Sequence, residues 1–138
     1  MIDQKTAPYA ALVLRLTTGA LFLVHGLTKL FVFTPAGTAG FFGSLGLPEW
    51  LGPLTMVVEI LGGIALILGV GTRVVSAVLV PVLLGAAFTA HWANGFGFSN
   101  AGGGWEYPMM WAAVQASLVL LGDGAYALKP VLLRPAQA

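Results

Sequence analysis

Four apolar stretches, each about 20 residues long, restrict what this chain can fold into. A helix of this length spans the hydrocarbon core of a bilayer, and the stretches cover residues 8–30, 51–70, 73–92 and 105–122. Asp, Glu, Lys and Arg make up only 8% of the 138 residues. Because a water-soluble domain carries about 25% charged residues, a soluble enzyme is excluded. The sequence predicts an all-α, polytopic membrane protein, a four-transmembrane-helix bundle that forms a single domain over residues 1–138.

The connections between these stretches carry further structural signals. Residues 38–48, TAGFFGSLGLP, are too few to span a bilayer, so we expect a short outer interfacial segment or a segment folded back over the bundle mouth. Thr72 follows a tight glycine turn and is expected to be the N-cap of the third span. Pro81 lies inside that span and is expected to kink it.

The distribution of basic residues predicts the orientation in the membrane. Four of them fall on one side of the four-span arrangement and Lys29 on the other; the four are Lys5, Arg73, Lys129 and Arg134. Since positive charge is retained on the cytoplasmic side, both termini are expected in the cytoplasm of a bacterial-type plasma membrane, an inner membrane. The 31–50 and 93–104 connections then face outward. Aromatic residues at this outward boundary form the expected interfacial belt: Phe31, Phe33, Trp50, Trp92, Trp105 and Tyr107.

Charge and cysteine content exclude several kinds of chemistry. The net charge is only +1, so no basic surface for nucleic acid is present. The chain has no cysteine, which excludes disulfide chemistry, thiolate metal sites and iron–sulfur clusters held by this chain. No short histidine or carboxylate spacing typical of a metal site links the remaining ligand residues, so no metal site is predicted.

Ionisable residues inside the predicted spans require a partner, because each costs roughly 2.5–3.5 kcal/mol in a bilayer. On the first span, spacings of three and four place one set of residues on a single helical face that holds every strongly polar residue of the span: Arg15, Thr18, Phe22, His25 and Lys29. Glu59 lies near the middle of the second span, where His25 is nearest in depth and Arg15 can reach by its long stem.

We therefore predict one polar funnel that opens on the outer side. Its rim is formed by Lys29, His91 and Glu106, its middle by His25 and Glu59, and its base by Arg15. Gln115 falls on the opposite face from Glu106 and is left out. Each member also has a structural interpretation. Arg15 and Glu59 can be an ion pair that fixes helix register, Lys29 can extend to lipid headgroups, His91 can cap a span and Glu106 can complement a helix dipole.

The order and spacing of several short motifs resemble the DoxX family of small four-helix membrane proteins. These are Arg15, HGLTKL at 25–30, LGLP at 45–48, Glu59 with Gly62, GTR at 71–73, His91, GGGWE at 102–106 and LGDGAYALKP at 121–130. The similarity covers about residues 12–130. It implies a four-helix bundle linked to quinone reductases or to redox-stress complexes, with Arg15, His25, Lys29, Glu59, Arg73, His91 and Glu106 as candidate site residues. Thiosulfate chemistry, known for some relatives, is not carried over, because this chain has no cysteine to carry sulfur.

Three functions remain open at this point. In the first, which rests mainly on the resemblance, the chain is an oxidoreductase-associated subunit that binds a quinone or a similar lipophilic molecule in the funnel, while a redox protein partner supplies electrons. In the second it is a small-solute transporter that uses Glu59 as a proton-coupled carboxylate. In the third it is a non-catalytic scaffold whose ionic interior only specifies packing. Whether the chain catalyses a reaction is left open. A homodimer through Gly62-Gly63 and Gly85-Ala86-Ala87 is a further expectation.

Overall fold

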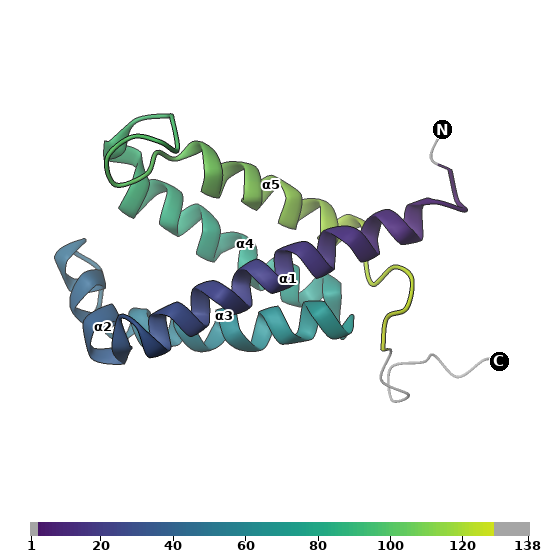
Figure 1. The fold of residues 1–138 in the computed structure, drawn as a ribbon, viewed down its shortest axis with the longest axis horizontal. Coiled ribbons are helices and arrows are strands. Elements are labelled where there is room, and N and C mark those ends of the chain that lie inside the picture. Colours follow the sequence, from purple (N-terminus) through teal and green to yellow (C-terminus); the bar gives the residue numbers. More distant parts are fainter. Residues whose placement is uncertain (1–2, 129–138) are drawn as a thin grey trace.

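The computed structural model describes residues 3–128, and all regular elements in this range are helices (Figure 1). The long helix α4 continues through one π-helical turn, Ala87–His91, and a 3-10 turn, Trp92–Asn94. The prediction of an all-α chain is confirmed. The α-helices are α1 (Ala7–Phe31), α2 (Thr34–Ser44), α3 (Leu51–Leu68), α4 (Thr72–Ala86) and α5 (Glu106–Leu121).

Three helical stretches are long and apolar enough to cross a membrane: α1, α3 and the run Thr72–Asn94 that begins with α4. They expose large apolar side chains, including Val13 at 61%, Leu61 at 62% and Val74 at 71%, as a surface in contact with lipid requires. The chain is a multi-pass membrane protein. Helix α5 has 16 residues, a length of about 24 Å at 1.5 Å per residue, so a fourth crossing stays a prediction.

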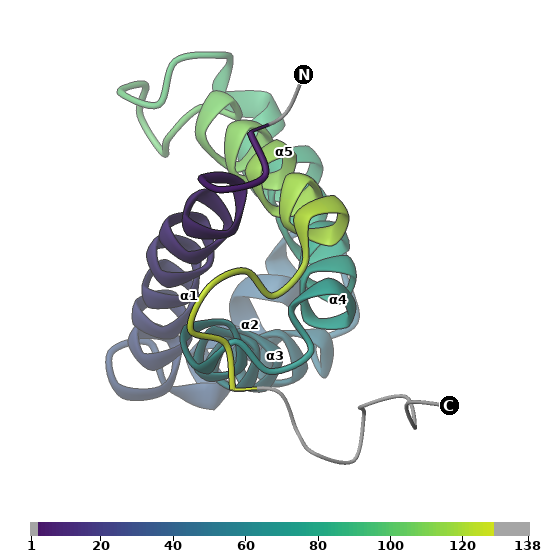
Figure 2. The same ribbon diagram turned by 90° about the vertical axis from the view of Figure 1, so that its right-hand side faces the viewer.

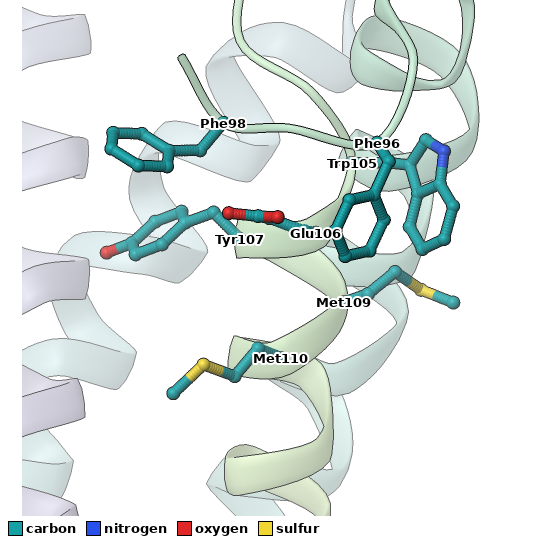
Figure 3. A pocket seen from close by; sticks show the side chains of 7 residues that line it. All are labelled: Phe96, Phe98, Trp105, Glu106, Tyr107, Met109 and Met110. Carbon is teal, nitrogen blue, oxygen red and sulfur yellow. The ribbon is translucent and has the colours of Figure 1, made fainter.

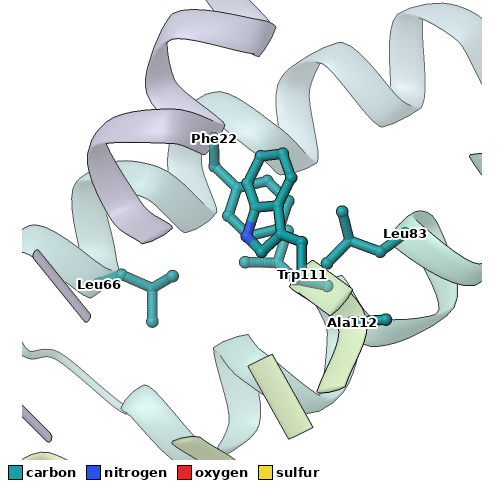
Figure 4. Close-up of a cluster of buried hydrophobic side chains, with 6 residues drawn as sticks. Phe22, Leu66, Leu83, Trp111 and Ala112 are labelled. Atoms are coloured by element: carbon teal, nitrogen blue, oxygen red, sulfur yellow. The ribbon is translucent and has the colours of Figure 1, made fainter. Parts of the chain in front are cut away.

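The long helices form two antiparallel pairs, α1 with α3 and α4 with α5 (Figure 1). In Figure 1 the pairs lie close together at the right-hand end and diverge toward the end that carries α2 and the loop after Asn94. Figure 2 shows the four helices arranged around a common centre. The described chain enters and leaves the bundle at the same end. Buried apolar side chains fill the centre: Phe22, Leu66, Leu79, Leu83, Trp111 and Ala112 (Figure 4).

Helices α1 and α3 approach closely because glycines face each other at their crossing. A Cβ atom added to Gly63 would lie 2.7 Å from the Gly19 carbonyl oxygen and 2.7 Å from the Leu23 nitrogen. Gly62 is buried against Leu79 of α4. Both glycines are therefore used within one chain, and the expectation that this pair forms a contact between two copies is wrong. Gly85 has open space around its Cα and leaves that part of the surface available.

Helix α2 covers the ends of α1 and α3 that lie on the diverging side of the bundle. The segment expected to begin at residue 38 begins as a helix at Thr34, directly after α1. Thr34 has φ +64°, which turns the chain sharply. α2 packs so closely on α3 that a Cβ atom at Gly52 would lie 2.8 Å from the Thr38 carbonyl oxygen. This contact fixes α2 to the bundle.

The other end of the bundle is closed by the segment 122–128, which we call the closing segment. Its Asp123 Oδ1 accepts a hydrogen bond of 3.0 Å from the Thr72 backbone N–H. Thr72 is the first residue of α4 and Gly71 precedes it in the left-handed conformation, so the prediction of Thr72 as N-cap is wrong. α4 is continuous through Pro81. Two of the basic residues used to predict orientation, Lys129 and Arg134, lie outside the described residues.

Candidate functional site

Lys29 and Glu59 form an ion pair between α1 and α3. The Lys29 Nζ atom lies 2.6 Å from Glu59 Oε2, and the side chains are 19% and 8% exposed. Lys29 is in the last turn of α1, and its long stem lets the ammonium reach a carboxylate in the middle of α3. The cation opposite Glu59 is therefore neither His25 nor Arg15, which were the expected partners.

His25 lies one turn before Lys29, at the point where the polar face of α1 leaves the core. Thr18 and Phe22 on the same face are buried, whereas His25 is exposed. Its ring meets Trp111 of α5 edge-on, with centroids 5.3 Å apart. The Trp111 indole N–H is buried and has no hydrogen-bond partner among the described residues. The α1–α5 edge thus combines an accessible imidazole, which can hydrogen-bond a ligand oxygen, with a buried donor that has no partner among the described residues.

Arg15 is buried at the opposite end of the bundle, only 1% exposed, and binds backbone carbonyls. Its Nη1 donates to Leu66 O at 3.0 Å and to Ile67 O at 2.6 Å, in the last turn of α3. Nε donates to Asp123 O at 2.9 Å and Nη2 to Ala125 O at 2.8 Å. The guanidinium thus joins α1 to the end of α3 and to the closing segment. We call this set of four hydrogen bonds the Arg15 clamp. The expected Arg15–Glu59 ion pair is not formed.

His91 and Glu106 belong to the loop end of the α4–α5 pair. His91 Nδ1 donates to the Gly103 carbonyl oxygen at 3.0 Å, which ties the π-helical turn to the loop before α5. Glu106 is the first residue of α5 and lines a separate hollow beside that loop. His91 thus holds the loop against the end of the α4 run, whereas the sequence-based interpretation was a cap on the span itself.

The six predicted residues are therefore distributed over three places. Lys29 and Glu59 are in contact and His25 is one turn away. Arg15 is part of the clamp at the far end, and the loop end holds His91 and Glu106. A single continuous funnel through all six is not the arrangement found among residues 3–128. The candidate site is the group formed by Lys29, Glu59 and His25 with Trp111, which we call the Lys29–Glu59 site.

Two interior groups were missed by the sequence reasoning. Gln115 is fully buried and donates from Nε2 to Ser76 Oγ at 2.8 Å, so it joins α5 to α4. It lies one turn after Trp111, and that i to i+4 spacing was the available signal. The prediction left Gln115 out because it lies on the opposite face of the helix from Glu106. Glu106 itself does not point to the centre of the bundle. Asp123 is the other missed residue, and nothing in its local sequence identifies Thr72 as its partner.

Comparison with known proteins identifies the family. The sequence model of DoxX matches residues 10–92, which contain most of α1, all of α2 and α3 and nearly all of the third candidate span. The chain belongs to the DoxX family. The DoxX match includes the whole Lys29–Glu59 pair and His25, while α5 with Trp111 lies outside it.

Two curated relatives extend the similarity to almost the full chain. One, from Bacillus subtilis (strain 168), is named "Putative oxidoreductase CatD" and is 32% identical over 131 residues, covering 95% of this chain and 92% of the relative. The other, from Haemophilus influenzae (strain ATCC 51907 / DSM 11121 / KW20 / Rd), is named "Uncharacterized protein" and is 33% identical over 126 residues, with 91% and 92% coverage. No solved structure gives a significant match. Of these two relatives, the one from Bacillus subtilis is named as an oxidoreductase.

Proposed function

We propose that this chain is the membrane subunit of a quinone-linked redox complex and that the Lys29–Glu59 site binds the quinone or a similar lipophilic molecule. The observation that supports this most directly is the ion pair itself, which holds a cation and a carboxylate next to an accessible imidazole. Apolar helices surround this group, and the indole N–H of Trp111 nearby has no partner in the described structure. The name of the Bacillus relative supports a redox setting.

The chemistry of a quinone matches these side chains. Reduction of a quinone to a quinol takes two electrons and two protons, and both oxygens accept hydrogen bonds throughout. The Lys29 ammonium and a His25 ring N–H can donate to one oxygen, and Glu59 can pass protons to Lys29 or His25. The electrons must come from a redox partner protein, because the chain carries no motif for a flavin, a haem or an iron–sulfur cluster.

A scaffold function is the second candidate, and the same ion pair favours it. The pair joins α1 to α3, which also meet at Gly19 and Gly63, so it stabilises one helix–helix contact. In that case the charges specify packing and no ligand is needed.

Quinone content tests the proposal. The protein is purified in mild detergent and extracted with organic solvent, and bound quinone is quantified by mass spectrometry. We expect near-stoichiometric quinone in the native protein and about a tenfold loss in His25→Ala and Glu59→Gln, because each removes a group that donates to the oxygens or positions the donor. Circular dichroism confirms that each variant is folded. Equal trace amounts in all three proteins would contradict quinone binding.

We infer that α5 is the fourth crossing and that both termini are cytoplasmic. One support is that α5 runs antiparallel to α4 along its length. The other is that both ends of the described chain lie at the same end of the bundle (Figure 1). The chain has no cysteine, so single cysteines at Gln4, Ser99 and Leu128 can be labelled without background. In right-side-out membranes an impermeant maleimide should label only Ser99→Cys. Labelling of both Ser99→Cys and Leu128→Cys would contradict the fourth crossing.

A further inference from the structure

A hollow of about 520 Å³ lies between the first turns of α5 and the loop after Asn94. Figure 3 shows the Glu106 carboxylate in its middle, with Phe98 and Tyr107 on one side and Phe96 and Trp105 on the other. Met109 and Met110 continue the apolar wall along α5. None of its lining residues belongs to the Lys29–Glu59 pair. We call this hollow the Glu106 pocket.

The loop that forms the Glu106 pocket is held in place by its own hydrogen bonds. Backbone N–H groups of Trp105 and Glu106 donate to the carbonyl oxygens of Gly95 at 3.0 Å and Phe96 at 3.1 Å. Asn94 Nδ2 donates to Gly103 O at 2.9 Å. At Gly104 any side chain would clash with the Phe96 carbonyl group. The backbone that carries the aromatic rings is therefore held in place before a ligand binds, which lowers the entropic cost of binding.

Glu106 supplies a charge that the described structure leaves unbalanced. Its side chain is half-buried, and no Lys, Arg or His of residues 3–128 lies within 4 Å of its carboxylate oxygens. Its position in the first turn of α5 complements the helix dipole. That effect explains a carboxylate at this residue but not the four aromatic side chains around it.

We propose that the Glu106 pocket binds an organic ammonium group attached to an apolar body. A carboxylate attracts the positive charge, and the faces of aromatic rings stabilise an alkylated ammonium by cation–π contact. The methionine side chains provide a polarisable apolar wall for the rest of the molecule. A hollow of this size is in the range of small-molecule sites.

Other ligand classes fit less well. A divalent metal ion takes several oxygen ligands, whereas the lining contains a single carboxylate. An anion would be repelled by Glu106, and a neutral apolar molecule would remove water from that carboxylate without replacing its interactions. Charge and ring arrangement together favour a cation that is itself partly apolar.

Calorimetric titration in dodecyl maltoside tests the proposal with benzyltrimethylammonium as the probe. Neopentylbenzene, in which carbon replaces the charged nitrogen, is the neutral control ligand. We expect Glu106→Gln to weaken binding of the charged probe at least about tenfold and to leave the neutral one unchanged. Glu106→Asp should retain most of the affinity. Glu49→Gln removes an exposed carboxylate at the same end of the bundle and should bind like the native protein.

The source of the ammonium group is resolved by native mass spectrometry in micelles with equal amounts of phosphatidylethanolamine and phosphatidylglycerol of identical chains. Preferential retention of the ethanolamine lipid, lost in Glu106→Gln, identifies a lipid headgroup. Equal retention of both lipids with probe binding intact identifies a free lipophilic amine. Failure of the native protein to bind the probe, or equal binding by Glu106→Gln, overturns the proposal. These results do not depend on whether the Lys29–Glu59 site holds a quinone.

Discussion

Replacing Arg15 by methionine is expected to lower the free energy of unfolding by about 3–5 kcal/mol. The guanidinium supplies four hydrogen bonds to carbonyl oxygens at the end of α3 and in the closing segment. Methionine matches the aliphatic part of the arginine side chain but has no donor, so these carbonyl groups lose their hydrogen bonds from Arg15. Arg15→Lys should be intermediate, because one ammonium cannot bond to carbonyls on both sides in the way a planar guanidinium does.

The measurement is thermal unfolding in detergent, followed by tryptophan fluorescence. A matched control is Arg73→Met, since Arg73 is exposed and donates one hydrogen bond, to Val119 O at 2.9 Å. That variant should lose less than about 1 kcal/mol. For Arg15→Met we expect the midpoint to fall by roughly 10 °C or more. Equal shifts for the two variants would mean that the clamp does not hold the fold together.

Replacing both members of the Lys29–Glu59 pair is expected to separate stability from function. Glu59→Leu alone leaves the Lys29 ammonium without a partner and should cost about 2 kcal/mol or more. Adding Lys29→Met removes the stranded charge and should return stability to within about 1 kcal/mol of the native protein. The double variant should therefore fold normally. It should still contain no quinone, because neither new side chain can hydrogen-bond a quinone oxygen.

Unfolding midpoints and quinone content are measured on the same preparations of the native protein, both single variants and the double variant. Native quinone content in a stable double variant would assign the ion pair to packing and support the scaffold function. Loss of quinone together with restored stability would support the ligand site. A double variant less stable than both single variants would show that the charges are needed for the fold itself.

The helices were predictable because each span depends on a local property, about 20 consecutive apolar residues. The partners of the ionisable residues were not, since they depend on how helices pack. Depth along the axes suggested His25 or Arg15 opposite Glu59, whereas Lys29 reaches Glu59 because its stem extends back along the helix. Of the polar face of α1 that was predicted to point into the bundle, Arg15, Thr18 and Phe22 are buried and Lys29 pairs with Glu59, whereas His25 is exposed.

The Arg15 clamp at the other end of the bundle illustrates a different limit of prediction from sequence. Arg15 binds main-chain carbonyl groups, which every residue has, so no side-chain pattern reveals them. Asp123 caps α4 from 51 residues away, and this contact depends on the irregular path of the closing segment. The loop around Glu106 is similar, because its shape depends on glycines and on side-chain amides such as Asn94.

The Arg15 clamp can form fully only after both ends of the described chain have been synthesised. Two of its four acceptors, Asp123 O and Ala125 O, come from the last residues of the described chain, more than 100 positions after Arg15. The first span must therefore enter the bilayer while its arginine has only α3 to bind, or no partner at all. Release of the closing segment from the ribosome supplies the remaining acceptors. A chain shortened before residue 123 would keep the two hydrogen bonds from Arg15 to α3 and lose the other two, so its buried guanidinium would be only half satisfied.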